Sequence, residues 1–213
     1  MEIVWLGHSC FLIKGKERAI ITDPYRPDPS CSWPEPGADI VTISHFHPGH
    51  SYIEGVAGNP KQVDGPGEYE IEGIFITGTS TFHDNEKGKL RGNNTVYLVE
   101  MDGVALCHLG DLGHGLTSQL IEEIGAVDIL FLPVGEVNAI NIDTAIETLR
   151  QLEARIVVPM HYKTDVLPRD LAPLSKFLTK MGVSEAESRP KLSITASSMP
   201  PSAQVVVLDC KRG

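Results

Sequence analysis

The first half of the chain consists of short apolar runs separated by turn residues, a pattern typical of β-strands. The segment Lys-Gly-Lys-Glu at residues 14–17 is one such turn, and the runs on either side of it predict a hairpin. Two irregular loops, at residues 24–38 and 83–94, interrupt the pattern. We therefore predict antiparallel meanders, with strands at residues 2–6, 10–14, 18–22, 38–43, 62–63, 68–71, 74–77, 95–100 and 104–108.

From about residue 117 the apolar positions take on a helical period. Thr144 and Glu147 have the T-x-x-E spacing of a capping box, which places the start of a helix at Thr144. Helices are predicted at residues 117–124, 144–153 and 170–181, and strands at residues 127–132, 155–158, 191–195 and 204–208. Strands followed by alternating helices and strands indicate a mixed α/β (α+β) fold.

Length and composition restrict the class of protein. The 213 residues suit one globular domain, which we predict to span residues 1–213. No apolar run approaches the roughly 18 residues of a membrane span, and no basic lead-in precedes the apolar N-terminus, so we expect a soluble, cytoplasmic protein with no membrane partner. The net charge of -10 and the lack of a basic stripe disfavour nucleic acid and favour a small-molecule substrate. Nothing in the sequence predicts the oligomeric state.

Residues 44–50, Ser-His-Phe-His-Pro-Gly-His, hold three of the eight histidines directly after a predicted strand. Strand ends are where α/β folds carry their chemistry. In extended backbone, His45 and His47 lie on one face and can reach the same metal ion. The Pro-Gly pair that follows lets the chain turn and bring His50 to the same side. The pattern therefore predicts a metal site rather than a chance grouping.

Four later positions have the character of ligands because each follows an apolar run: His83, Asp111, His161 and, as an additional candidate, Asp84. This ordered set resembles the metallo-β-lactamase superfamily over nearly the whole chain. It is most similar to the branch that includes L-ascorbate-6-phosphate lactonase. The segments that carry this resemblance are Trp5-Leu6-Gly7-His8-Ser9, Thr22-Asp23-Pro24, Phe82-His83-Asp84, Arg91-Gly92-Asn93-Asn94, His108-Leu109-Gly110-Asp111-Leu112-Gly113-His114, Leu132-Pro133-Val134-Gly135 and Pro159-Met160-His161-Tyr162.

The resemblance implies an αββα sandwich with a metal site at one edge of its two sheets. It also implies two metal ions bridged by Asp111. The other implied ligands are His45, His47 and His83 for the first ion, and His50 and His161 for the second. Gly49 stands where the family has an aspartate, which removes a ligand of the second ion and a carboxylate that would help to orient the nucleophilic water.

The donor types favour zinc, as one or two ions, with manganese and iron as alternatives. Three neutral imidazoles leave a fourth position of Zn²⁺ open to water, so the first site needs nothing from Gly49. The second retains three potential ligands, and Asp23, Asp84 or further water could fill the gap. The number of metal ions stays open.

The expected activity is metal-dependent hydrolysis, because zinc lowers the pKa of its bound water to about 7 and supplies hydroxide. The predicted substrate is a small ester or lactone, with or without a phosphate group, and Asp111 and His161 are the predicted catalytic residues. The alternative is a non-catalytic metal-binding or ligand-sensing domain, which Gly49 favours. A nuclease is disfavoured by the acidic charge, whereas an iron redox role stays open because ligand type alone does not decide the metal.

Other polar residues near these motifs have two interpretations each. His8, His108 and His114 either hydrogen-bond to ligands and join the centre or are structural, and the structural role is favoured. Asp23 either caps a turn or hydrogen-bonds a ligand histidine, with equal weight.

The loops raise the same question. Arg91, Asn93 and Asn94 either recognise a substrate phosphate or lie on a solvated surface, which is favoured. Tyr162 either stabilises an oxyanion or packs in the core. Cys31 lies in a loop that could wall a pocket, but a lone cysteine is a weak metal candidate, and the four cysteines lack any C-x-x-C pair.

Overall fold

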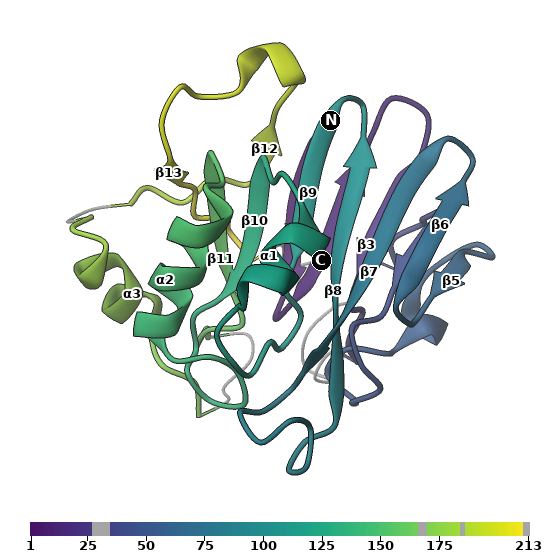
Figure 1. The fold of residues 1–213 in the computed structure, drawn as a ribbon. Coiled ribbons are helices and arrows are strands. Elements are labelled where there is room, and N and C mark those ends of the chain that lie inside the picture. The colour runs from purple at the N-terminus through teal and green to yellow at the C-terminus, as the bar shows by residue number, and fades with distance from the viewer. Residues whose placement is uncertain (27–34, 166–169, 184–185, 211–213) are drawn as a thin grey trace.

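Two β-sheets pack face to face in the computed structural model, which describes residues 1–26, 35–165, 170–183 and 186–210. The first sheet contains β1 (Glu2–Gly7), β2 (Cys10–Lys14), β3 (Ala19–Thr22), β4 (Ile40–Thr42), β5 (Lys61–Val63) and β12 (Leu192–Ser193). The second contains β6 (Gly67–Ile71), β7 (Ile74–Phe82), β8 (Asn93–Met101), β9 (Val104–His108), β10 (Ile129–Pro133), β11 (Ile156–Met160) and β13 (Gln204–Val205). Within the described residues the strand orders are β12-β1-β2-β3-β4-β5 and β13-β11-β10-β9-β8-β7-β6 (Figure 1).

Strand direction changes within each sheet. β1, β2 and β3 form an antiparallel meander, and β4 and β5 continue it in parallel. In the second sheet β6 to β9 are antiparallel, whereas β9, β10, β11 and β13 are parallel. The predicted antiparallel pairing is confirmed for β1–β3 and β6–β9, and so is the change to α/β in the second half, whereas β4 and β5 pair in parallel.

The three α-helices found in the described part of the chain lie on the side of the second sheet (Figure 1): α1 (Ser118–Ile124), α2 (Ile142–Leu152) and α3 (Leu174–Lys180). α1 contacts β7 and β8, and α2 contacts β10. The outer face of the first sheet is covered by loop residues, including Tyr25 and Val56, beside the short 3₁₀ helix η1 (Ile53–Gly55). A second 3₁₀ turn, η2 (Ala196–Ser198), precedes β13. This mixed α+β arrangement of two packed sheets is the predicted fold class.

Apolar side chains from both sheets interlock in the space between them. Phe11 of β2 and Phe131 of β10 have ring centroids 4.3 Å apart, and both rings are fully buried. Burial of a side chain of this size contributes about 1.5–3 kcal/mol. Tyr97 of β8 is also buried, and its hydroxyl donates a hydrogen bond across the interface to the carbonyl of Ile43, at 2.9 Å. That bond ties the second sheet to the residue that precedes the histidine cluster.

The strands next to the site differ in length from the prediction. The strand predicted at residues 38–43 is the shorter β4, so the chain leaves the sheet before the histidines. The strand predicted at 74–77 continues to Phe82, because β7 pairs with β8 along its whole length. As a result His83 emerges directly from a strand.

Two helix starts also differ. The helix predicted from residue 170 begins at Leu174, with Pro173 as its N-cap. The capping box at Thr144 is wrong: α2 begins at Ile142, and the side chain of Asn141 accepts a hydrogen bond from the Thr144 N–H at 2.9 Å. Asparagine is as good an N-cap as threonine, so local spacing alone did not choose between them. No helix in the described part of the chain is long and apolar enough to cross a membrane.

Replacement of Asn141 by alanine should lower the free energy of unfolding by about 1 kcal/mol, because the first turn of α2 loses its cap. Thr144→Ala is the matched control, since the Thr144 side chain does not cap the helix, and it should change that free energy by less than about 0.5 kcal/mol. Urea unfolding followed by circular dichroism measures both. If Thr144→Ala lowered the free energy of unfolding more than Asn141→Ala, the N-cap would be Thr144, as the sequence predicted.

Candidate metal centre

The predicted ligands converge at one edge of the sandwich because of strand direction. β9, β10 and β11 are parallel, and β7 runs in the same sense as β9 through the intervening antiparallel β8. The carboxyl ends of all these strands therefore meet at one edge. His83, Asp111 and His161 follow the ends of β7, β9 and β11, and the loop after β4 brings the histidine cluster to the same edge.

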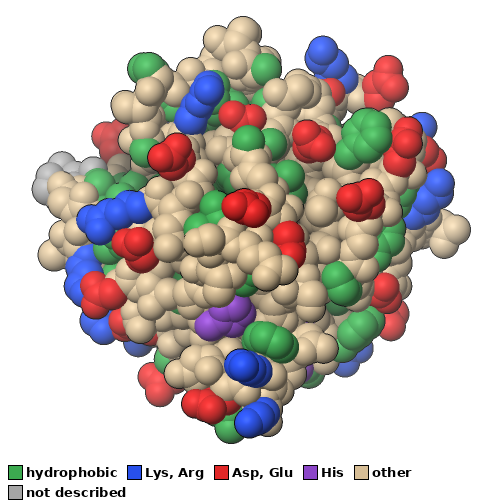
Figure 2. Space-filling model, viewed as in Figure 1, with side chains coloured by type: hydrophobic (Ala, Val, Ile, Leu, Met, Phe, Trp, Pro, Cys, Tyr) green, Lys and Arg blue, Asp and Glu red, His purple; other side chains and the backbone are tan. Residues whose placement is uncertain are grey.

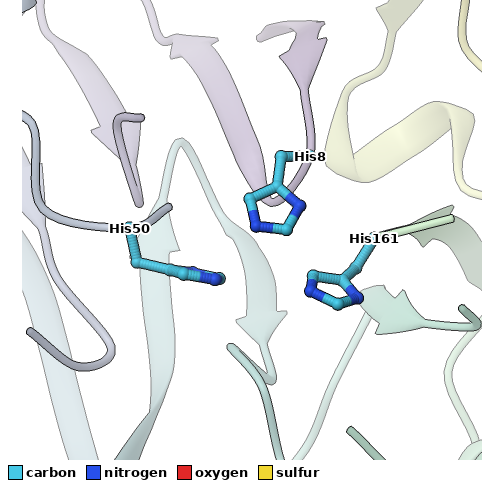
Figure 3. Close-up of side chains that lie close together, drawn as sticks. All are labelled: His8, His50 and His161. Carbon is cyan, nitrogen blue, oxygen red and sulfur yellow. The ribbon is translucent and has the colours of Figure 1, made fainter. Parts of the chain in front are cut away.

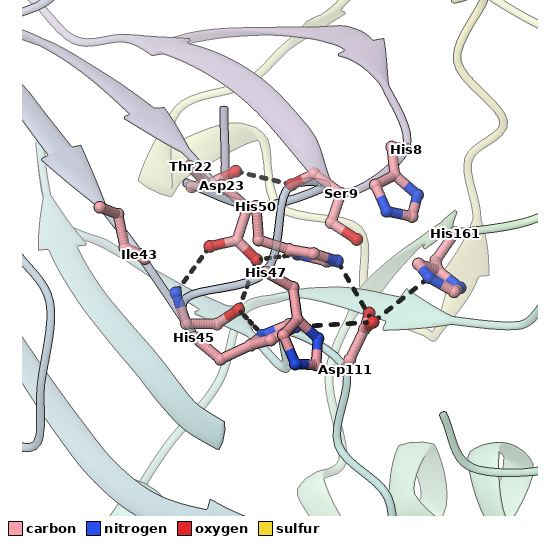
Figure 4. A network of polar contacts seen from close by, with 12 residues as sticks. His8, Ser9, Thr22, Asp23, Ile43, His45, His47, His50, Asp111 and His161 are labelled. Atoms are coloured by element: carbon pink, nitrogen blue, oxygen red, sulfur yellow. Dashed lines mark hydrogen bonds and ion pairs between the residues drawn. The ribbon is translucent and has the colours of Figure 1, made fainter. Parts of the chain in front are cut away.

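Asp111 lies at the centre of this group (Figure 4). Its Oδ2 atom is 3.2 Å from His50 Nε2, 3.3 Å from His161 Nε2, 3.6 Å from His83 Nε2 and 3.9 Å from His45 Nε2. All of these side chains are nearly inaccessible to solvent. The four histidines come from distant parts of the sequence, and the fold brings them together around one oxygen of Asp111.

Two groups of imidazoles flank Asp111. In each group, one nitrogen from every member lies within 4.8 Å of the others. The first group is His45, His47 and His83, and the second is His8, His50 and His161. The first matches the predicted set for one ion, whereas the second contains His8 in addition to the predicted pair.

The backbone of the histidine cluster is bent rather than extended, which corrects the expected basis of the chelate. The His47 N–H donates to the carbonyl of His45 at 3.1 Å, and the His50 N–H donates to that of His47 at 2.9 Å. These bonds curl the loop into successive turns. The rings of His45 and His47 still meet, with centroids 4.5 Å apart, because the turns and not a strand place them on one side.

Asp23 orients two of the imidazoles (Figure 4). Its carboxylate accepts hydrogen bonds from the Ser44 N–H at 2.7 Å, from the Ser44 hydroxyl at 2.6 Å and from His50 Nδ1 at 2.8 Å. The Ser44 oxygen is also 2.9 Å from His45 Nδ1. Because the hydroxyl donates to Asp23, it accepts from His45 Nδ1, so both histidines carry hydrogen on Nδ1 and direct Nε2 to Asp111. Of the two interpretations of Asp23, the structure shows the hydrogen bond to a histidine of the predicted ligand set, His50.

Asn94 and His108 hold the turn that carries Asp111. Asn94 Oδ1 accepts a hydrogen bond from the Asp111 N–H at 3.0 Å, and Asn94 is buried, so its expected place on a solvated surface is wrong. His108 Nδ1 accepts from the Gly110 N–H at 3.2 Å, which fits the structural role favoured for this histidine. Gly110 has φ of +58°, and a Cβ there would clash with Ser44 and Asn94. Only glycine lets this turn approach the histidine loop so closely.

The buried ionisable groups of the centre strongly affect one another's pKa values. Burial lowers the pKa of His45 to about 3, so its imidazole is neutral, the form that binds metals. Burial alone would raise the pKa of Asp111, but the neighbouring His161 and His50 hold it well below its usual range. Burial would likewise lower the pKa of His50, but Asp111 and Asp23 raise it to about 10. The two buried carboxylates thus favour positive charge between them, which a metal ion also supplies.

The donor set fits a divalent metal ion. Buried polar atoms are normally hydrogen-bonded, yet several atoms of the centre have no such partner. They are His45 Nε2, His83 Nδ1, Asp111 Oδ1 and His161 Nδ1. Imidazole nitrogens with a carboxylate oxygen suit zinc, and also manganese or iron. The ligand type therefore fits a metal centre without identifying the element.

The centre forms the floor of a cavity of about 410 Å³. The lining residues are His8, His47, Pro48, Gly49, His50, His83, Arg91, Asp111, Asn138 and His161. Phe46 and Leu90, each next in sequence to a lining residue, are exposed apolar side chains. Asn138 was not predicted as a site residue, because it lies in the loop after the Leu132–Gly135 segment and its residue type alone did not mark it.

The remaining candidates lie elsewhere. The Asp84 carboxylate accepts hydrogen bonds from four backbone N–H groups of residues 86–91, so it organises that loop and does not line the cavity of the metal centre. Tyr162 packs on Trp5, with centroids 5.0 Å apart, which fits the packed interpretation. His114 Nε2 accepts from the Phe82 N–H at 3.2 Å, a structural role. Cys31 lies outside the described residues.

Comparison with known proteins places this centre in a family. A family profile described as a β-lactamase superfamily domain matches residues 2–161. A metal-dependent hydrolase of Methanoculleus marisnigri is 31% identical over 189 residues, which cover 77% of this chain and 82% of the relative. One of Thermoplasma volcanium is 29% identical over 197 residues, which cover 80% of this chain and 87% of the relative.

A solved structure supports the same relationship. A Thermotoga maritima protein, described as a candidate Zn-dependent hydrolase of the metallo-β-lactamase superfamily, is 38% identical to this chain. The two structures superpose with a TM-score of 0.80, and the alignment covers 97% of each chain. The chain therefore belongs to the metallo-β-lactamase superfamily, in the family of metal-dependent hydrolases that these relatives represent.

Proposed function

We propose that this protein is a zinc-dependent hydrolase of a small ester or lactone that carries an anionic group such as phosphate. The observation that carries the proposal is the buried Asp111 carboxylate between two groups of imidazoles at the floor of an accessible cavity. Catalytic metal sites keep a position open to water or substrate, and here the open side is the cavity. The names of the relatives support a metal-dependent hydrolase but not a substrate.

His45, His47 and His83 would hold the metal ion together with Asp111. A metal ion in such a site polarises the substrate and lowers the pKa of a coordinated water. Asp23 and Ser44 fix the tautomer of His45, which keeps its Nε2 lone pair directed at the ion. Only His47 of these ligands is exposed, so substrate reaches the centre from its side.

Asp111 and His161 are positioned for proton transfer. Asp111 lines the cavity, so its carboxylate can accept a hydrogen bond from the attacking water and relay the proton that the water releases. Attack on the carbonyl carbon breaks its bond to the ester oxygen, and the departing alkoxide takes up a proton. With a metal ion in the first group alone, His161 lines the same cavity with Nε2 3.3 Å from Asp111 Oδ2 and can pass that proton to the alkoxide.

Arg91 supports an anionic substrate. Its backbone N–H donates to Asp84 at 2.7 Å, so the loop that Asp84 organises holds the exposed arginine at the cavity wall. It is the one lysine or arginine among the described residues that line this cavity. A guanidinium binds the oxygens of a phosphate or carboxylate with paired hydrogen bonds.

A small molecule is favoured over nucleic acid as the partner. The chain has a net charge of -10, and acidic and basic side chains alternate over the face shown in Figure 2 without a continuous basic surface. Nucleic-acid binding depends chiefly on such a surface. Proximity of Arg91 to the cavity supports recognition of one anionic group instead.

A non-catalytic metal-binding domain is the second candidate, and Gly49 is the observation that favours it. The position lines the cavity without a side chain, where the family resemblance implies a carboxylate. The first metal group does not include this position, so the loss affects only the second group directly. Turnover by the metal-loaded protein distinguishes the two candidates.

His47→Ala should abolish both metal retention in the first group and hydrolysis, with a loss of turnover greater than about 100-fold. Mutation of a residue that only hydrogen-bonds to a metal ligand typically costs about 10- to 100-fold, and loss of the ligand itself should cost more. Elemental analysis gives metal per chain, and a panel of small esters and lactones gives turnover. His114→Ala is the matched control, because His114 is outside both groups. A metal-free His47→Ala protein with full activity would contradict the proposal, and a wild-type protein that binds metal but hydrolyses nothing would favour the second candidate.

Asp23→Asn keeps the shape of the side chain but removes the charge that fixes Ser44 and His50. We expect zinc affinity to fall about 10- to 100-fold, as for other carboxylates that orient ligand histidines. Competition with a chromophoric chelator measures the affinity. Asp39→Asn provides the control, because Asp39 is far from the centre and pairs with Arg18. Equal affinities for the two variants would show that Asp23 does not act on the metal.

Arg91→Gln should raise the KM for phosphorylated substrates about 10- to 100-fold, which corresponds to the loss of one charge-assisted contact, and leave the KM for uncharged analogues nearly unchanged. The measurement compares paired esters or lactones with and without a phosphate. Lys89→Gln, on the same loop but outside the cavity lining, should leave both unchanged. A uniform change for charged and uncharged substrates would exclude anion recognition by Arg91.

A further inference from the structure

The second group of imidazoles lacks one expected ligand. Gly49 is buried in the cavity wall beside His50 and offers no side chain. His50, His161 and Asp111 alone supply three donors, one fewer than the set that the family resemblance implies with its loop aspartate. Apart from His45, which belongs to the first group, the imidazole of His8 lies beside those of His50 and His161.

We propose that His8 is the missing ligand, so that a second metal ion is held by His8, His50, His161 and Asp111. The proposal rests on the metal-dependent function described above and assigns to His8 a role that the family pattern gives to a residue in the histidine loop. The ligand is thus moved from the loop after β4 to the turn between β1 and β2.

The imidazoles of this group face a common point (Figure 3). One nitrogen from each of His8, His50 and His161 lies within 4.8 Å of the others. The ring centroid of His8 is 4.3 Å from that of His161 and 4.7 Å from that of His50. Two nitrogens bonded to one zinc at about 2.0–2.1 Å are at most roughly 4.2 Å apart, so small side-chain rotations close the site.

The backbone holds His8 in an uncommon conformation that aims it into the cavity. The pairing of β1 with β2 shifts register between Trp5 and Gly7, and such irregularities re-aim side chains. His8 itself has φ of +53°, which few residues other than glycine adopt. Strained backbone of this kind collects at functional sites.

His8 and His161 are also joined through the main chain. The His161 N–H donates to the His8 carbonyl at 3.0 Å, and the Trp5 indole N–H donates to the same oxygen at 3.1 Å. His161 has φ of +53° as well. Two histidines from different sheets, both with positive φ, are therefore bonded backbone to backbone and present their rings to the same space.

His8 changes the charge of the centre as well as its ligand count. A neutral imidazole in place of a carboxylate leaves the loaded centre more positive than the family arrangement, which favours an anionic substrate near Arg91. The competing role for His8 is packing, because its ring is only 2% exposed and meets Tyr25 edge-on at 6.1 Å. Removal of the imidazole would weaken metal binding if His8 is a ligand, but not if its ring only packs.

The test compares the wild type with His8→Asn, chosen because asparagine tolerates positive φ. Zinc per chain is measured by elemental analysis, and stepwise affinity by calorimetry. We expect about two ions for the wild type and about one for His8→Asn, with the second step weakened more than 10-fold and the first unchanged. His114→Asn is the matched control and should bind as the wild type does.

Two further measurements make the result decisive. His8→Asn combined with Gly49→Asp restores a ligand from the histidine loop and should regain the second ion. If His8→Asn does not fold, the wild type crystallised with zinc and examined by anomalous diffraction should show a His8 nitrogen about 2.0–2.1 Å from the second ion.

The contrary outcomes are distinct. A folded His8→Asn that binds two ions with wild-type affinity would make His8 a packed residue. A wild type that binds a single ion would remove the second site and this inference but leave a mononuclear hydrolase. A wild type that binds no ion would overturn the proposed function itself.

Discussion

The site depends on the burial of Asp111. A carboxylate that is only 3% exposed needs compensating charge, and the fold supplies it by placing imidazoles from separate elements around one of its oxygens. Asn94 fixes the backbone of Asp111, and Gly110 lets its turn come close to the histidine loop. A metal ion relieves the same constraint, since it adds positive charge where the carboxylate and the ring nitrogens already point.

The centre is made of loop residues, yet the two sheets hold those loops firmly. The Thr95 N–H donates to the Ser44 carbonyl at 2.8 Å, and the Tyr97 hydroxyl donates to that of Ile43, so β8 fixes the start of the histidine loop. On the other side, His161 bonds to the carbonyl of His8. Hydrogen bonds between the sheets thus set ligand positions, because loops that bridge a packed interface cannot move independently of it.

The proposed role of His8 would let the site keep its chemistry while one of its ligands changes. Gly49 removes a donor from the histidine loop, and His8 faces the same region from the turn between β1 and β2 of the same sheet. An exchange of this kind alters charge more than geometry, because both residues can supply one donor to the same ion. The more positive centre that this exchange would produce and the nearby Arg91 would favour the same type of substrate.

The sequence by itself determined the order of the elements, because the alternation of apolar residues is a local property. It also supplied the predicted ligand set, through the family resemblance and the histidines that follow apolar runs. For Asp23 the sequence left two roles open, a turn cap or a hydrogen bond to a ligand histidine. The tertiary structure alone decided the bent histidine loop, the N-cap at Asn141, the role of Asn94 and the placement of His8. Each of these depends on competing hydrogen bonds or on groups distant in sequence, and only the packing of the two sheets brings those groups together.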